Sequence, residues 1–285
     1  MCGIIFVVRK RPKKVYFIIF IIVLIIGLGI LLGFNFINGK SVNFNFIKKN
    51  KTSSKPFIFA VAGDNHENVE VYKELIQKVN NSQAVFFVDL GDTTRVSGLS
   101  EYAEKKAMLN NLKVPYHMVI GHHDIVGNGY DYWQQYFGLT YYSWDYENAH
   151  FVALDDVSYY NAFSEDELAW LEKDLSSSSK QLKFVFLHSP PRCPFVDPSE
   201  LGFKGLNSEE RINKFLNIIK KYKVDKIYAA HIHNLLNYSI NGIPITVTGG
   251  AGGPLYHIPL IGKDFYHFLE VEVSDGNFEQ KVIEL

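Results

Sequence analysis

Histidine and aspartate residues recur in short clusters along this 285-residue chain. The clusters are an Asp-x-His triplet, a Gly-Asp pair, a His-His-Asp run, a lone His and a His-x-His triplet. Seven side chains in them offer a carboxylate or an imidazole to a metal ion: Asp64, His66, Asp92, His122, His188, His231 and His233. Seven such ligands suit a pair of divalent ions when water and substrate fill the remaining positions, and Mn, Fe and Zn all accept this donor set.

Each cluster directly follows a short apolar run of the kind that forms a buried strand. The runs that we expect to be strands cover residues 57–62, 84–89, 116–120, 151–154, 184–187 and 226–230. Polar groups at the C-terminal ends of sheet strands converge in one crevice, where α/β proteins bind ligands. One isolated His or Asp at a strand end has little meaning. The prediction of a common metal site depends on the clusters occurring together and in order.

Amphipathic segments between the runs predict helices at 69–79, 165–175 and 209–222. Residues 142–144 and 150–155 flank Glu147-Asn148 and predict an antiparallel hairpin. The C-terminal segments 238–240, 245–248, 265–273 and 279–283 also favour antiparallel strands. The fold class is therefore mixed α/β, with a second sheet that is partly antiparallel.

The ordered clusters resemble the pattern of the calcineurin-like metallophosphoesterase family, which reads D-x-H, G-D, G-N-H-D/E, H and G-H-x-H. The resemblance extends from about residue 57 to the C-terminus, and includes Ser-Trp-Asp-Tyr at 143–146 and Leu-Ala-Trp-Leu at 168–171. It implies a four-layer α/β/β/α sandwich with two mixed sheets flanked by helices. It also implies a hydrolase of phosphate mono- or diesters that uses a dinuclear metal site and a bridging hydroxide.

The same resemblance assigns roles to individual residues. One metal ion would have three ligands: Asp64, His66 and His233. The other would have three imidazoles: His122, His188 and His231. Asp92 would bridge both ions, while His123 would contact the phosphoryl oxygens or protonate the leaving group. Asp124 would orient His123 as its hydrogen-bond partner.

The chain departs from the family pattern at two positions. His122 stands where the family usually has Asn, which favours borderline ions such as Zn or Fe and leaves Mn open. Ala230 replaces the usual Gly before His231, and its methyl group is tolerated if the backbone there has a negative φ. The purple acid phosphatase branch carries a metal-binding Tyr shortly after the second aspartate. Asp92 is followed by Thr-Thr-Arg, which disfavours that branch.

Other residues near the clusters have two open interpretations. Arg95 and Arg192 are either phosphate-binding groups or solvated loop residues. A group of aromatic residues either packs in the core or contributes one or two rings to a substrate cleft: Tyr130, Tyr132, Trp133, Tyr136 and Phe137. The glycine-rich stretch 249–254 lacks the Lys-Ser/Thr ending of a P-loop, and we expect it to be a close-approach loop at the site.

Residues 15–37 form an uncharged apolar run, long enough to cross a hydrocarbon core of ~30 Å as a helix. We therefore expect a short basic tail at 1–14, a single-pass transmembrane anchor at 15–37, a linker at 38–55 and a metallophosphoesterase domain at 56–285. A cleaved signal peptide is the alternative to the anchor. Flanking Lys and Arg are equal in number on the two sides. They are denser upstream, which favours an extracytoplasmic domain.

Charge and cysteine content constrain the partners. Residues 1–55 hold ten Lys or Arg and no Asp or Glu, which leaves 19 basic and 30 acidic residues, a formal net of −11, in the rest of the chain. Such an acidic domain is not expected to bind nucleic acid. Cys2 and Cys193 lie on opposite sides of the expected span, so they are not expected to pair. We expect a phosphoester substrate at or near the membrane, and the sequence leaves the oligomeric state open. The alternative to an enzyme is a catalytically silent metal-binding scaffold of the same fold.

Overall fold

The computed structural model describes residues 55–66, 68–158, 163–196, 208–258 and 262–285. The expected basic tail, the anchor at 15–37 and nearly all of the linker lie outside these residues. Within the described ranges, no helix combines the length and the apolar character that a membrane span requires. The anchor and its orientation therefore stay predictions.

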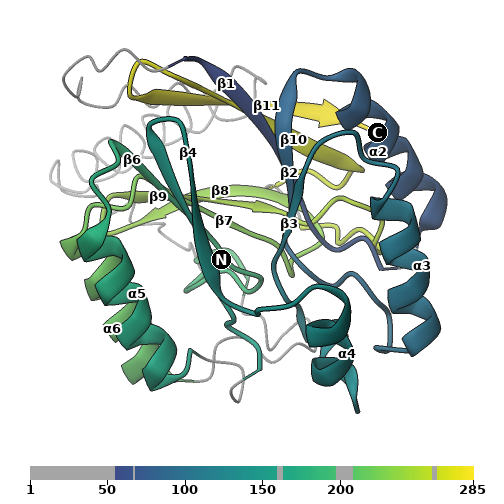
Figure 1. The fold of residues 1–285 in the computed structure, drawn as a ribbon, viewed down its shortest axis with the longest axis horizontal. Helices are drawn as coiled ribbons and strands as arrows, with labels where there is room; N and C mark the ends of the chain where they lie inside the picture. Colours follow the sequence, from purple (N-terminus) through teal and green to yellow (C-terminus); the bar gives the residue numbers. More distant parts are fainter. Residues whose placement is uncertain (1–54, 67, 159–162, 197–207, 259–261) are drawn as a thin grey trace, which may run out of the picture. The chain divides into compact units, whose positions relative to one another are not determined.

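Two mixed sheets stack on each other (Figure 1). The first has the order β11-β10-β1-β2-β3, in which β1, β2 and β3 are parallel, β10 runs antiparallel to β1, and β11 runs antiparallel to β10. Its strands are β1 (Phe57–Ala62), β2 (Ala84–Asp89), β3 (Tyr116–Met118), β10 (His267–Ser274) and β11 (Asn277–Glu284). Because β1, β2 and β3 are parallel, their C-terminal ends share one edge of the sheet.

The second sheet has the order β4-β5-β6-β7-β9-β8. The inner strands β5, β6, β7 and β9 are parallel, and the edge strands β4 and β8 are antiparallel to their neighbours. The strands are β4 (Tyr142–Tyr146), β5 (Ala149–Ala153), β6 (Leu182–Phe186), β7 (Lys226–Ala229), β8 (Leu235–Ile240) and β9 (Ile243–Thr248). The expected hairpin at 142–155 is confirmed as β4 and β5.

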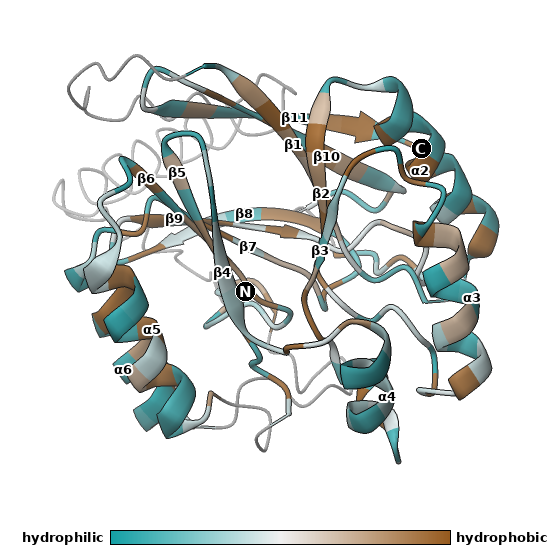
Figure 2. Ribbon diagram, viewed as in Figure 1, coloured by the Kyte–Doolittle hydropathy of each residue, from teal (hydrophilic) through white to brown (hydrophobic). Residues whose placement is uncertain are grey.

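Helices cover the outer face of each sheet, which completes the expected four layers. Those on the first sheet are α2 (Val69–Asn81), α3 (Leu99–Leu109) and α4 (Gly129–Tyr136). Those on the second are α5 (Glu165–Ser177) and α6 (Glu209–Lys221). Helices α2 and α6 each have an apolar stripe that faces their sheet and polar residues that face outward (Figure 2).

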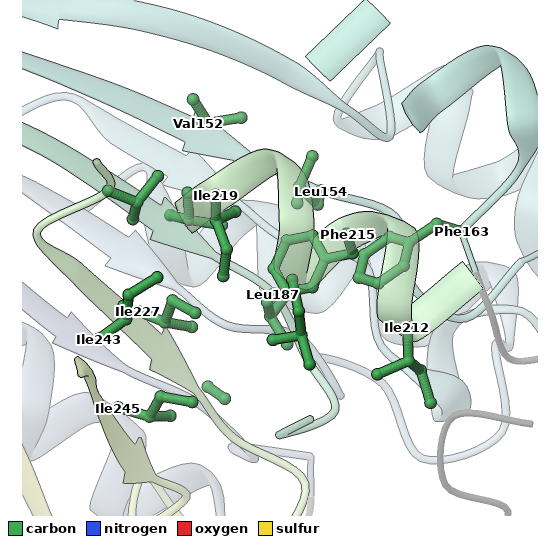
Figure 3. Packing of buried hydrophobic residues seen from close by; sticks show 14 of the residues in the cluster. Val152, Leu154, Phe163, Leu187, Ile212, Phe215, Ile219, Ile227, Ile243 and Ile245 are labelled. Carbon is green, nitrogen blue, oxygen red and sulfur yellow. The ribbon is translucent and has the colours of Figure 1, made fainter. Parts of the chain in front are cut away.

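Three apolar clusters hold the layers together. The central one fills the space between the sheets and is rich in aromatic rings: Phe59 stacks on Phe86 with centroids 5.3 Å apart and meets Phe151 edge-on at 5.5 Å. A second cluster lies under α5 and α6, where Phe163 stacks on Phe215 at 4.6 Å (Figure 3). The third lies under α2, α3 and α4. The sheets are therefore fixed from both sides, which gives the loops at their edges a rigid base.

Two helices, α3 and α4, do not appear among the elements expected from the sequence. The buried positions of α3 have helical spacing, but one of them is occupied by Lys105 beside Tyr102, Met108 and Leu109. A charged residue at a core position hides the apolar period on which the prediction depends. In α4 only Gly129 and Trp133 are buried, so this short helix shows no apolar stripe. The strand expected at 116–120 is shorter, since β3 ends at Met118.

Candidate metal centre

All seven predicted ligand residues lie in segments that follow β1, β2, β3, β6 and β7. Backbone hydrogen bonds continue beyond the strands and hold these segments in place. Asp64 N donates to Gly91 O at 3.0 Å, and Ala230 N donates to His188 O at 2.9 Å. Across the two sheets, His188 Nδ1 hydrogen-bonds to Leu90 O at 2.8 Å. The predicted convergence of the strand ends is therefore confirmed.

Three of the ligand residues have a left-handed backbone, with φ of 61° at Asp64, 52° at Asp92 and 66° at His231. Non-glycine residues rarely adopt this conformation, and it persists only where the surroundings enforce it. Ala230, immediately before His231, is not among the residues of positive φ in the described part of the chain. Its methyl group is accommodated as expected.

The seven side chains come together in three overlapping groups, within each of which the ligand atoms lie no more than 4.8 Å apart. The groups are His122, His188 and His231; His66, Asp92 and His233; and Asp64, Asp92 and His188. The first is the imidazole set predicted for one ion. Asp92 occurs in both of the others, beside ligands predicted for each ion, which is the arrangement that a bridging carboxylate needs. Asp64 also lies near His233, with Oδ1 3.8 Å from Nε2.

A cation suits this site because carboxylate and imidazole groups crowd together in it away from solvent. Asp64 is fully buried, and among the described residues its carboxylate oxygens have no hydrogen bond of ordinary geometry, although the backbone of His231 lies close enough to lower its pKa. A buried carboxylate in that condition is costly unless a positive charge compensates it. Around it, Asp92 Oδ2 and His231 Nδ1 each lie 3.3 Å from His188 Nε2. The residues present therefore fit a metal centre.

Burial and mutual charge set the protonation of the ligands. Burial lowers the pKa of His66 to about 3 and that of His231 well below its usual value, so both imidazoles have a lone pair available for a metal. Burial raises the pKa of Asp64 well above its ordinary value. Burial also disfavours the charged forms of Asp92 and His188, but the attraction between their opposite charges and the hydrogen bond between them outweigh this penalty. The pKa of Asp92 is held well below its usual range, and that of His188 is raised to about 10.

His123 lies against one of the predicted ligands, His66, and its orienting partner differs from the one predicted. Its ring stacks on that of His66 with centroids 4.7 Å apart, and its Nδ1 lies 2.6 Å from Arg95 O. Because a carbonyl only accepts, Nδ1 must carry a hydrogen, and Nε2 is the atom left for a substrate. The prediction that Asp124 is the hydrogen-bond partner of His123 is wrong.

Asp124 instead fixes the backbone around the site. Its fully buried carboxylate accepts hydrogen bonds from Thr94 N at 2.8 Å, Gly121 N at 3.0 Å and Thr93 N at 3.2 Å. His123 and Asp124 both belong to the 3₁₀ turn η1 (His122–Asp124), where successive side chains point ~120° apart. The His123 ring therefore faces the site, while the Asp124 carboxylate faces the loop that carries Asp92.

The open interpretations of nearby residues are partly resolved. Arg192 is paired with Glu209 and lies 2.9 Å from Asn213, both on α6, so it is a surface loop residue. Most of the aromatic group is packing: Trp133 is fully buried, and Tyr136 and Phe137 pack around the ring of Tyr102. Tyr130 is exposed. The glycine-rich loop approaches the site closely, since a Cβ at Gly249 would lie 2.2 Å from Asp64 Oδ2.

Several residues that support the site were not predicted. Asp156 is fully buried and accepts from His188 N at 2.8 Å and Ser189 N at 2.7 Å, so it fixes the turn that presents His188. Lys105, Asn65, Asp89 and Tyr72 form a hydrogen-bonded network beneath Asp64 and His66. Asp89 and Asp156 stand at strand ends, like the ligands, and that position was the available signal. Lys105 gave none, because a lysine on a helix is normally exposed.

The chain is similar to known proteins in sequence and in fold. The family model for calcineurin-like phosphoesterases matches residues 57–235. A probable glycerophosphodiester phosphodiesterase GpdQ from Arcobacter nitrofigilis is 27% identical over 215 residues, which cover 68% of this chain and 74% of the relative.

Solved structures share the fold at low identity. The purple acid phosphatase PPD1 from yellow lupin (Lupinus luteus) has a TM-score of 0.65 at 16% identity, over 83% of this chain and 53% of its own. GAP50, described as the anchor in the inner membrane complex of Plasmodium, has a TM-score of 0.63 at 17% identity, and the match covers 80% of this chain and 84% of GAP50. A dimetal phosphatase from Danio rerio has a TM-score of 0.59 at 15% identity, and the match covers 80% of this chain and 98% of the phosphatase.

Proposed function

Because this chain belongs to the calcineurin-like phosphoesterase family, we propose that it is a phosphoric ester hydrolase that depends on a dinuclear metal centre. The observation that carries the proposal is the convergence of seven carboxylate and imidazole side chains in three overlapping groups, two of which share Asp92. Mn, Fe and Zn are the candidate ions. The Arcobacter relative, a probable glycerophosphodiester phosphodiesterase, adds support for diesters among the substrates.

Two metal ions, when bound, supply charge for the attacking and leaving oxygens and activate water. The first ion would be held by Asp64, His66 and His233, the second by His122, His188 and His231, with Asp92 between them. His123 would act on the substrate through Nε2, either on a phosphoryl oxygen or as the proton donor to the leaving group. The stacking on His66 and the hydrogen bond to Arg95 O hold the ring in one orientation, which supports this role.

A chromogenic assay tests the proposal. We expect metal-stripped protein to hydrolyse an aryl phosphate monoester or diester only after Mn, Fe or Zn is added. Asp92→Asn should abolish turnover while the circular dichroism spectrum stays unchanged. Asp275→Asn is a matched control: it is an exposed turn residue with φ of 49°, a backbone conformation that Asn tolerates. Full activity of Asp92→Asn would refute the proposal, and no turnover of wild type with any ion would favour the scaffold.

The rim of the site supports a substrate with an apolar part. We propose that the exposed large apolar residues of the segments that meet at Ser97 form a patch beside His123: Val96, Leu99, Val126 and Tyr130. Val96 and Val126 are 60% and 53% exposed. They are brought together by Ser97, whose Oγ accepts from Val126 N at 2.9 Å and donates to His123 O at 2.6 Å. We propose that the substrate is an amphiphilic phosphoester, such as a lipid phosphate, whose apolar part lies on this patch.

Detergent-dispersed lipid phosphates and soluble nucleotides distinguish the two substrate classes. The double variant Val96→Ser and Val126→Ser should raise KM for the lipid phosphate and leave KM for a soluble aryl phosphate unchanged. Val282→Ser serves as the control, because Val282 is an exposed apolar residue on β11. Equal kinetics of the double variant and wild type on the lipid phosphate would remove the support for an amphiphilic substrate.

We further propose that residues 15–37 anchor the chain in a membrane, followed by a linker at 38–55, with the catalytic domain on the extracytoplasmic side. The uncharged apolar run and the dense basic charge upstream of it support this topology. A reporter fused to the C-terminus that functions on only one side of the membrane tests the orientation. Recovery of the full chain in the soluble fraction after lysis would contradict the anchor.

A further inference from the structure

A buried lysine lies beneath the segment that carries two of the metal ligands. Lys105 of α3 is only 3% exposed, and its Nζ donates to both oxygens of Asn65, at 2.9 Å to the backbone O and 2.8 Å to Oδ1. Asn65 is the residue between Asp64 and His66. The same ammonium group lies 4.8 Å from the centre of the Tyr72 ring. One charged group thus holds the main chain and the side chain of the residue between two ligands.

The hydrogen bonds continue from Asn65 to the segment that carries the bridging carboxylate. Asn65 Nδ2 donates to Asp89 Oδ2 at 2.7 Å, and the Tyr72 hydroxyl donates to the same oxygen at 2.7 Å. The other oxygen of Asp89 accepts from Gly91 N at 3.1 Å, next to Asp92 in the chain. The network therefore links the Asp64–His66 segment to the Asp92 segment through buried groups alone.

Both of these segments contain a strained backbone. Asp64 and Asp92 have positive φ, and a residue with a Cβ keeps that conformation only under constraint. A methyl-bearing residue cannot replace Gly91 without a clash, since its Cβ would lie 2.7 Å from Gly121 N. The loops are thus closely fitted, and a rotation at Asn65 would move Asp64 and His66 away from Asp92.

Burial of a lysine is unfavourable, and the other buried positions of α3 are ordinary core residues. Tyr102, Met108 and Leu109 fill them. A Leu or Met in place of Lys105 would bury the same stem without an ammonium group to desolvate. The hydrogen bonds that the charged Nζ donates to Asn65 therefore explain why a lysine occupies this buried position.

We propose that Lys105, acting through Asn65, is a positioning residue that preorganises Asp64 and His66 for the metal ion they share with His233. This inference rests on the proposed metal-dependent function. Preorganisation lowers the cost of ordering ligands when the ion binds. The effect should fall mainly on that ion, because the residue that Lys105 holds, Asn65, lies between two of its predicted ligands.

The test is metal binding by the full-length protein, measured by equilibrium dialysis against Mn²⁺ and by metal analysis of the retained protein. We expect wild type to bind two ions. Lys105→Met should bind one ion about as well as wild type and the other about 10- to 100-fold more weakly, the range seen when outer partners of ligands are removed. Asn65→Ala removes the side-chain acceptor and should weaken the binding of the same ion. It provides the test if Lys105→Met folds poorly.

Lys226→Met is the matched control. Lys226 is also 3% exposed and donates to Thr246 Oγ1 at 2.6 Å, but it starts β7, at the opposite end of that strand from His231. It should change stability without changing either metal affinity. If wild type binds two ions and both Lys105→Met and Asn65→Ala keep both affinities, the positioning role is refuted. If wild type binds no metal, the proposed function itself fails.

Discussion

The buried lysine at the start of β7 predicts an unusual dependence of stability on pH. Burial lowers the pKa of Lys226 to about 7, from an ordinary value near 10.5. In the unfolded chain the lysine stays charged up to about pH 10. Between about pH 7 and pH 10 the unfolded state therefore binds more protons than the folded state, so stability rises with pH across that window.

The magnitude follows from the difference between the two pKa values. Each pKa unit corresponds to about 1.4 kcal/mol, so the folded protein carries a cost of about 4 to 5 kcal/mol at pH 7 and about 2 kcal/mol at pH 9. Against this stands the hydrogen bond from Nζ to Thr246 Oγ1, which contributes about 1 kcal/mol. Thr246 keeps a partner without the lysine, because its hydroxyl also donates to Asn237 Oδ1 at 2.6 Å. The cost of burial is larger, and Lys226→Met should stabilise the protein at pH 7.

Urea unfolding of wild type and Lys226→Met at several pH values measures this difference directly, with other titrating groups cancelling between the two proteins. The advantage of the variant should shrink by about 2 kcal/mol between pH 7 and pH 9. A variant that is less stable than wild type by the same amount at both pH values would refute the reasoning. That result would mean that Lys226 is not discharged by burial and that its hydrogen bond outweighs desolvation.

Three further predictions concern catalysis, pH and packing. His123→Asn should lower kcat about 100- to 10,000-fold, the usual contribution of a general acid, with the bound metal content unchanged by metal analysis. Burial disfavours charge on His150, but its hydrogen bonds to Asp174 and Asp145, both 2.7 Å long, raise its pKa. The stabilising effect of the charged ring is therefore present below about pH 6.5 and is lost as the pH rises through the pKa of the folded state. His150→Gln should therefore lower the urea midpoint more at pH 5.5 than at pH 8.5, and the reverse order would contradict it. Phe59→Ala, at the centre of the aromatic cluster between the sheets, should cost about 3 to 5 kcal/mol in the same measurement, while a loss below about 1 kcal/mol would show that the core repacks.

Ligand residues and most strands were predicted from the sequence because the relevant signals are local. An apolar run that ends in Asp or His needs no distant partner to be recognised, and parallel strand ends meet at one edge of a sheet whatever the details of packing. His188 and the His231–His233 pair were found in this way, and the structure brings them together. The close approach of the glycine-rich loop followed from composition alone, and Gly249 beside Asp64 confirms it.

What the sequence left undecided depends on contacts between residues that are far apart in the chain. Lys105 meets Asn65 across 40 residues, and His188 meets Leu90 O across 98. The direction of a side chain in a short turn is equally non-local, which is why Asp124 was assigned to His123 when it holds Thr93 and Thr94 instead. Residue types at strand ends thus determined where a candidate metal site would lie, and packing of the two sheets decided which groups hold its side chains in place.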